Sequence, residues 1–354
     1  MNDNRDTPST TPVQPKPKGQ HFIPRFLLNG FASRPCDEQY VWFFRTGRPP
    51  VEVNTRDVAK QKYFHGDPAT SPLEHAVARH ETSFAELVQR LRSGNASREE
   101  FKAVPELVVH LWVRTKNIRD GFAVTCRGLL DSVQEMLDEC KRDSSACKAM
   151  EALLASAIDN ELRAPQNDAF RALGFVQRQR IRMGMRRMIV RGRLLTELVP
   201  YLQSQRPFLD DAMGNVSRDI QLSSLSKELA PRARVEELSS LHWDVVQAIG
   251  SRLILGDVVV TARTERRSEY VHLTAADNNF PLIGVAVPLT PESALIGSRR
   301  AITSLNASEL NEASAALSRD FFIASQRTTA EERLVDLLGT RADLFTKEQI
   351  REIT

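Results

Sequence analysis

The sequence predicts an α+β fold in which a mainly helical body carries a small mixed or antiparallel sheet. Apolar side chains recur at helical spacing through most of residues 71–201. Shorter runs rich in Val, Ile, Leu and Phe, bounded by turn residues, lie at about 40–53 and 252–288. We therefore expect early and late strands to share one sheet, so that distant parts of the chain close on each other.

The bulk composition is that of an ordinary globular protein. Of the 354 residues, 26% are charged and 41% are hydrophobic, and the net charge of +3 is too small to indicate a nucleic-acid binder by itself. The cysteines form no Cys-x-x-Cys pair, so we expect reduced thiols and neither a disulfide frame nor a zinc site. No apolar run approaches the ~18 residues of a membrane span. These features predict a soluble, cytoplasmic protein with no membrane partner.

Three segments are expected along the chain. Residues 1–19 carry four prolines among polar residues and no apolar core, which predicts a disordered tail and no signal peptide. Residues 20–325 form the folded domain, and 326–354 form C-terminal helices. At the start of the domain, Pro24 can begin a short helix that Gly30 ends. This places His21 at a helix entrance, with Arg25 pointing outward one turn later.

The helical body begins with a clear start signal. Ser71-Pro72-Leu73-Glu74 combines a capping Ser, a Pro in the first turn and a Glu that can reach back to the Ser amide, and the helix should run to Arg92. Ser97 to Glu100 repeats the capping pattern. The helix that follows should continue past Pro105 to about Arg142, kinked or restarted at the Pro. Two more helices are predicted at 146–162 and 167–201.

The strands form two groups. Tyr40 to Phe44 and Val51 to Val53 predict an early hairpin around the turn at 46–50. Three later strands are expected at 252–261, 270–273 and 282–288, and a helix capped by Ser308 should then run through Ala324. If the sheet joins both groups, His21 approaches Asp257.

Short motifs occur in the order found in one known family. His21, Pro24, Leu28 and Phe31 fit the pattern His-x-x-Pro-x-x-x-Leu-x-x-Phe. On these residues the chain resembles DUF4238, a large family of uncharacterised bacterial proteins. The resemblance covers roughly residues 20–325 and continues through Val41-Trp42-Phe43-Phe44, Val53-Asn54, Lys62-Tyr63-Phe64, Glu81, Arg114-Thr115, Leu253 to Val259, Val287-Pro288-Leu289-Thr290 and Asn311. Lys116 replaces the Pro of the family's Arg-Thr-Pro, and Leu255-Gly256 replaces its Thr-Ser. The resemblance implies positions and no chemistry.

His21 and Glu81 are the first candidates for a site. An imidazole at a loop-helix boundary can act as a general base or a metal ligand, or it can bind a carbonyl and fix the amino-terminal segment. Glu81 lies at the border of an apolar helix stripe, where a carboxylate needs a cation or a metal ion. Arg25 or Arg114 could supply that cation in a purely structural ion pair.

Asp257 and Asn311 are later candidates. Asp257 follows an apolar strand, so it marks either a strand end that faces a cleft or a turn in which it caps the backbone. Asn311, one turn into a helix, either reaches across to the same cleft or serves the helix start.

A basic segment offers a different function. Residues 169–196 contain eight arginines and no acidic residue, and Arg178, Arg182 and Arg186 stack on one helix side. Such a face can contact the phosphates of a nucleic acid, or it can be a solvated face paired with acidic neighbours.

Two hypotheses follow, since the standard hydrolase, kinase and dinucleotide motifs are absent from the sequence. In the first, the chain is an intracellular hydrolase or nuclease-like protein of bacterial conflict or defence. His21 is its base, Glu81 and Asp257 hold a divalent metal ion or a water molecule, and Arg114 clamps an anion with help from Arg25 and Asn311. In the second, the same residues form a buried network in a non-catalytic binding protein, whose contact surface is the basic helix at 178–193.

Overall fold

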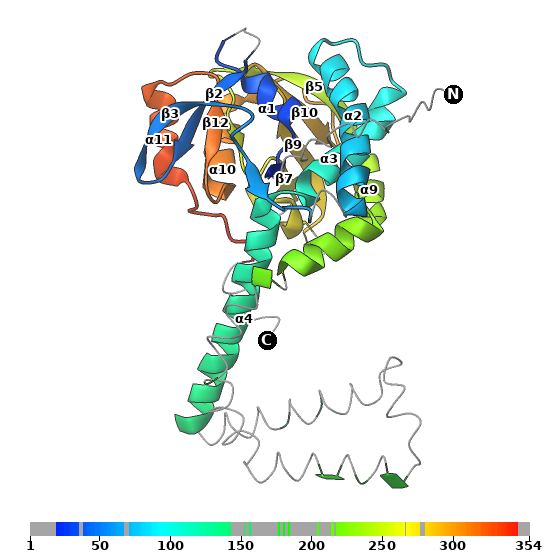
Figure 1. Ribbon diagram of the computed structural model, residues 1–354, viewed down its shortest axis with the longest axis vertical. Coiled ribbons are helices and arrows are strands. Elements are labelled where there is room, and N and C mark those ends of the chain that lie inside the picture. The colour runs from blue at the N-terminus through cyan, green and yellow to red at the C-terminus, as the bar shows by residue number, and fades with distance from the viewer. Residues whose placement is uncertain are drawn as a thin grey trace, which may run out of the picture. The chain divides into compact units, whose positions relative to one another are not determined.

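The computed structural model divides into two compact units (Figure 1). The first contains Met1–Arg119 and Asp219–Ala342, and the second contains Asp120–Arg218 and Asp343–Thr354. The structure describes residues 19–34, 38–66, 71–142, 217–265, 267–276 and 280–345, with a few isolated positions between 152 and 215. The predicted tail before residue 19 and most of the predicted helices at 146–162 and 167–201 lie outside the described residues. Arg178, Arg182 and Arg186 lie outside them as well.

The largest sheet of the first unit is a six-stranded, curled half-barrel, so the prediction of a small sheet is wrong. All its described pairs are antiparallel except β11 with β5. In spatial order its strands are β11 (Leu305–Asn306), β5 (His242–Ile249), β10 (Ser293–Ser298), β9 (Leu282–Pro288), β7 (Thr261–Thr264) and β8 (Arg267–His272). The predicted strands at 270–273 and 282–288 correspond to β8 and β9, whereas β5 and β10 were not predicted.

The second sheet joins early and late parts of the chain, as expected, but the expected late strands at 270–273 and 282–288 lie in the half-barrel instead. Its order is β3 (Arg48–Asn54), β2 (Tyr40–Arg45), β12 (Phe322–Ala324) and β6 (Leu255–Gly256). Strand β12 lies between the early hairpin and β6, and Phe44 stacks on Phe322 with ring centroids 4.7 Å apart. The helix predicted through Ala324 therefore ends too late, because α10 covers Ala307–Leu317 and its side-chain cap comes from Asn306 and not Ser308.

A third, two-stranded sheet carries His21. Strand β1 (Gly19–His21) pairs with β4 (Lys60–Lys62), and His21 lies opposite Lys60. The predicted short helix is present as α1 (Arg25–Leu28), followed by a 3-10 turn at Asn29–Phe31. His21 is consequently the last residue of a strand that precedes the helix, so the prediction of a helix entrance is wrong by a few residues.

Helices pack beside these sheets. Helix α2 (Pro72–Arg92) has the predicted bounds and buries Leu73, Val77, Phe84, Leu87, Val88 and Leu91. Its predicted Ser cap is wrong, because the Ser71 hydroxyl donates to the His65 carbonyl and makes no cap hydrogen bond. The Ser97–Glu100 box is confirmed by hydrogen bonds in both directions. Further helices of the first unit are α3 (Val104–Val113), α9 (Arg232–Ser239) and α11 (Thr329–Leu334), and residues 217–227 are helical too. Helix α4 (Lys116–Arg142) begins in the first unit and belongs mostly to the second.

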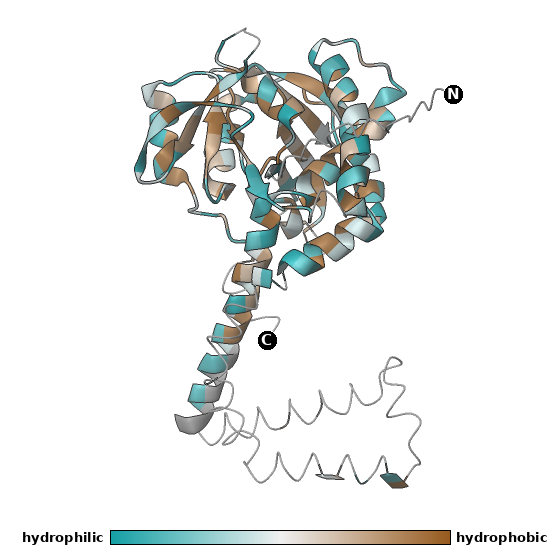
Figure 2. Ribbon diagram, in the orientation of Figure 1, coloured by the Kyte–Doolittle hydropathy of each residue, from teal (hydrophilic) through white to brown (hydrophobic). Residues whose placement is uncertain are grey.

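One large apolar core and two smaller apolar clusters lie in the described part of the first unit. The large core is the main one. It joins α1, α2 and α3 to the inner face of the half-barrel, and Figure 2 draws β9, β10 and β12 mainly in brown. Arg92, at the end of α2, links these layers by donating to the Phe26 and Leu27 carbonyls at the end of α1 and to Leu289 after β9. Gly30 permits this approach, because a Cβ there would lie 2.3 Å from the Leu289 oxygen.

None of the helices in the described part of the chain is both long and apolar enough to cross a membrane.

Candidate functional site

Arg114 lies at the centre of a polar cluster inside the first unit. It ends the apolar helix α3 and is only 1% exposed, so its charge and donors need partners within the protein. One terminal nitrogen pairs with the Glu81 carboxylate and lies 3.3 Å from His110 Nε2. The other donates to the His21 carbonyl at 2.6 Å and lies 3.4 Å from His65 Nε2. Three segments distant in sequence are thus held around one guanidinium group.

The His21 imidazole adjoins this pair and is half-buried. Burial is the main cause that lowers the pKa of His21 from 6.5 to about 4, and the positive charge of Arg25 lowers it further. The Glu81 carboxylate and a hydrogen bond with the Val58 backbone act in the opposite direction. His21 Nδ1 is a buried atom and has no hydrogen-bond partner among the described residues. Near neutral pH the ring is therefore uncharged and can accept a proton.

Two further imidazoles are buried in the cluster. Burial, followed by the charge of Arg114, lowers the pKa of His65 to about 3 and that of His110 well below its usual value. As neutral rings, they can accept hydrogen bonds from Arg114 without adding positive charge. The side-chain amide of Gln20 fixes the segment of His65, because it accepts from the His65 amide at 2.6 Å and donates to the Gly66 carbonyl at 2.9 Å.

Solvent reaches the cluster through two of its members. The Glu81 side chain is 32% exposed and His21 is half-buried, whereas Arg114, His65 and His110 are nearly inaccessible. The cluster is consequently neither fully sealed nor a wide active-site cavity. A reacting group can approach only the side formed by His21 and Glu81.

Asp257 belongs to a different hydrogen-bond network. Its buried carboxylate accepts from three consecutive backbone amides, those of Arg319 at 2.9 Å, Asp320 at 2.7 Å and Phe321 at 3.3 Å, and from Asn117 Nδ2 at 3.2 Å. Burial raises the pKa of Asp257, and the amides of Asp320 and Arg319 oppose that shift. This carboxylate fixes a loop, which is the backbone-capping role that the sequence left open.

The segment after Asp257 is a strained turn and not the predicted continuous strand. Val259 has a φ of 58°, which is rare for a β-branched residue, and the Val260 amide donates to the Val258 carbonyl at 2.6 Å. Because β6 stops at Gly256, this turn carries the chain from the four-stranded sheet into β7 of the half-barrel.

The two remaining candidates are apart from the cluster or at its edge. Asn311 is buried on α10, where it accepts from the Ile254 amide at 3.0 Å and donates to the Arg252 carbonyl at 2.7 Å. It therefore fastens the helix to the segment before β6. Arg25 is the exposed first residue of α1, and its charge acts on His21.

A cleft of about 780 Å³ lies beside His21 in the first unit. Val58, whose backbone bonds His21, lines this cleft, and the charge of His21 acts on Asp57 in the same wall. Phe43 and Phe321 also line it, with ring centroids 4.9 Å apart. The loop that Asp257 fixes also contributes lining residues. Asp257 thus shapes this cleft without facing His21.

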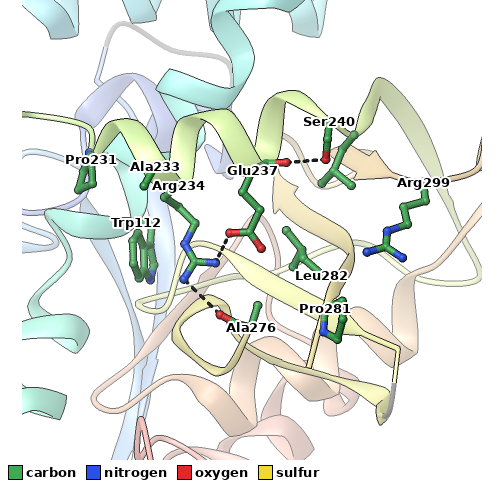
Figure 3. A pocket seen from close by; sticks show the side chains of 11 residues that line it. Trp112, Pro231, Ala233, Arg234, Glu237, Ser240, Ala276, Pro281, Leu282 and Arg299 are labelled. Atoms are coloured by element: carbon green, nitrogen blue, oxygen red, sulfur yellow. Dashed lines mark hydrogen bonds and ion pairs between the residues drawn. The ribbon is translucent and has the colours of Figure 1, made fainter. Parts of the chain in front are cut away.

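Another pocket, of about 750 Å³, lies between α9 and the half-barrel (Figure 3). Arg234 extends across it, 5.6 Å from the Trp112 ring, and donates to Glu237 at 2.5 Å and to the Ala276 carbonyl at 3.3 Å. Its lining charge is already paired, so this pocket offers less to a ligand than the cleft beside His21.

Sequence reasoning missed His65 and His110 as members of the cluster. No fixed spacing links them, because they meet only when α3 packs against the β1–β4 region. One signal was available: an Arg directly after Leu111-Trp112-Val113 on an apolar helix must find buried acceptors.

Neither metal-binding side chains among the described residues nor known relatives indicate a reaction for this site. In the part of the chain that the structure describes, no three His, Cys, Asp or Glu side chains gather so that they could hold a metal ion. A family model described as "Protein of unknown function (DUF4238)" matches residues 19–338. No curated protein and no solved structure matches the chain.

Proposed function

Because the chain belongs to the DUF4238 family, whose function is unknown, we propose from the geometry around His21 that it is a nuclease-like hydrolase of phosphodiesters. One observation carries the proposal. His21 is a neutral, half-buried imidazole whose buried Nδ1 has no hydrogen-bond partner among the described residues, and the charges of Glu81 and Arg114 act on it. In this proposal a water molecule reaches His21 Nδ1 and gives it a proton, and the resulting hydroxide attacks phosphorus. The P–O bond to the leaving group breaks, and the alkoxide departs with the bonding electrons and takes up a proton from solvent water.

The surrounding charges favour an anionic substrate. Arg25 lies near the ring, and Lys60 is its cross-strand neighbour. An anion bound beside Arg25 would offset the positive charge that helps to hold the pKa of His21 near 4. Substrate binding would then bring the base closer to the neutral range, where proton transfer is most effective.

Glu81 and Arg114 act in this proposal as positioning residues. Arg114 holds the His21 carbonyl, and Glu81 balances the buried guanidinium charge and faces solvent beside the ring. Asp257 and Asn311 are not part of the reacting group, because backbone and side-chain partners already engage them. A setting in bacterial conflict or defence and a cytoplasmic location stay predictions, as does the use of a divalent metal ion.

The test is cleavage of end-labelled single-stranded DNA and RNA by the purified chain, with Mg²⁺, with Mn²⁺ and with chelator. His21→Asn should lower the rate by roughly 100-fold or more. The matched control His242→Asn changes an exposed ring on β5 and should retain the wild-type rate. Equal residual rates for wild type and His21→Asn would refute the role of His21.

The alternative function is non-catalytic binding through the basic helix at 178–193, which lies largely outside the described residues. It would show as nucleic-acid affinity that falls steeply with salt, without cleavage and without dependence on His21.

A further inference from the structure

Both aromatic and cationic side chains line the cleft beside His21. The rings of Phe43 and Phe321 lie 4.9 Å apart between centroids, and Phe22 approaches Phe321 at 6.3 Å between ring centroids. Phe43 is only half-buried, so part of its ring remains available to a ligand. Flat aromatic groups bind such surfaces by stacking, which contributes ~1–3 kcal/mol per base in nucleic-acid complexes.

Cations outnumber carboxylates along the walls. The lining contains Arg45, Lys60, Lys116 and Arg319 against Asp57 and Asp320. Two ion pairs, Lys60 with Asp57 at 2.5 Å and Lys116 with Asp320 at 2.6 Å, account for both carboxylates. These pairs leave Arg45 and Arg319 in the lining, and Arg319 already donates to the Ala342 carbonyl at 2.8 Å. A phosphate monoester, which carries about −1.5 to −2 near pH 7, suits a lining in which positive charge exceeds negative charge.

Arg45 is the cation that this balance leaves for a ligand. Its guanidinium carbon lies 5.5 Å from the Phe43 ring centre, and it has no ion-pair partner among the residues that the structure describes. A guanidinium beside an aromatic face is suited to a ligand in which a flat ring and a phosphate lie close together. The side chains for both parts of such a ligand therefore come from one strand, β2.

Hydrogen bonds fix the backbone segments that line the cleft. Asp257 binds the amides of Arg319, Asp320 and Phe321, which supply one wall. On the opposite side Ala59 has a φ of 52°, unusual for a residue with a side chain, and its carbonyl accepts from the Phe22 amide at 2.9 Å. Strained backbone is typical of positions that function requires, and here it lines the cleft.

We propose that this cleft binds a nucleotide, with the base against Phe43 and Phe321 and the phosphate on Arg45. This inference rests on the proposed function, because it assigns a substrate class, nucleotides, to the site at which His21 would act in hydrolysis. The binding step itself requires no catalysis by His21.

Titration calorimetry at low salt tests the proposal. The probes are AMP, GMP, CMP and UMP, compared with adenosine, ribose 5-phosphate and inorganic phosphate. At least one nucleotide should bind roughly tenfold more tightly than the probes that lack base or phosphate, because each part adds its own interaction. If inorganic phosphate binds as tightly as any nucleotide, or no nucleotide binds, the proposal is overturned.

Variants locate the site. Arg45→Gln and Phe43→Leu should each weaken nucleotide binding by roughly tenfold. Arg98→Gln removes an exposed Arg that is not among the lining residues and should bind as the wild type does. Thermal denaturation shows whether each variant is folded. Wild-type affinity in folded Arg45→Gln and Phe43→Leu would place the nucleotide elsewhere and refute the assignment.

His21→Asn separates this inference from the proposed function. Binding that persists in His21→Asn while cleavage is lost supports both. Binding without any cleavage by the wild type refutes the hydrolase and leaves the nucleotide site standing. Cleavage that depends on His21, with no nucleotide affinity in the cleft, refutes the nucleotide site and supports the hydrolase.

Discussion

Acid should destabilise the fold through the buried imidazoles around Arg114. The folded-state pKa is about 4 for His21 and about 3 for His65, and that of His110 is also well below 6.5, mainly because of burial. In the unfolded chain the same rings take up protons near pH 6.5. Below that pH the unfolded state binds more protons, so stability is present above pH 6.5 and is lost as the pH falls toward 4 and 3.

The size of this effect follows from the width of the window. At pH 5 an unfolded imidazole is almost fully protonated while its folded counterpart is not, which costs roughly 2 kcal/mol for each ring. His21 and His65 together cost on the order of 4 kcal/mol between pH 7 and pH 5, and His110 acts in the same direction. That loss is a large part of the whole stability of many domains.

Urea denaturation followed by circular dichroism at pH 7, 6 and 5 measures the loss. His65→Gln keeps an acceptor for Arg114 but cannot take up a proton, so it should reduce the loss between pH 7 and pH 5 by roughly 2 kcal/mol. His242→Gln, which changes an exposed ring, should follow the wild type. Equal losses in His65→Gln and wild type, with equal denaturant slopes, would refute this account of the cluster.

Two further changes test the framework of the site. Asp257→Asn turns an amide group toward the Asp320 and Phe321 backbone amides, which leaves two buried donors unsatisfied. The free energy of unfolding should fall by roughly 3 kcal/mol. The exposed control Asp244→Asn should change it by less than about 0.5 kcal/mol. Gly30→Ala should lower the free energy of unfolding by roughly 2 kcal/mol, because its Cβ would press on the Leu289 oxygen; an unchanged denaturant midpoint would contradict the close approach.

Local signals predicted helix α2 well. Helix α2 has its expected bounds because Pro72 marks its start and Ser93-Gly94 its end, both through backbone preferences that depend on neighbouring residues alone. The strands depend on partners distant in sequence. Strand β12 has only three residues and pairs with β2 and β6, and nothing local distinguishes it from the end of α10.

The same distinction applies to the candidate site. Glu81 needed a cation because a carboxylate beside an apolar stripe is costly, and Arg114 was one of the two cations considered. The expected meeting of His21 and Asp257 required knowledge of which strands pair. With β12 between the early hairpin and β6, Asp257 instead holds the loop that leads into β12.

The position of β12 has a consequence for synthesis of the chain. Its partner β2 leaves the ribosome first, yet Phe44 pairs with Phe322, about 280 residues later. Until then the β2–β3 hairpin has an open edge that carries Trp42 and two phenylalanines. Nascent chains should therefore need a chaperone or rapid collapse to keep that edge from pairing with another molecule.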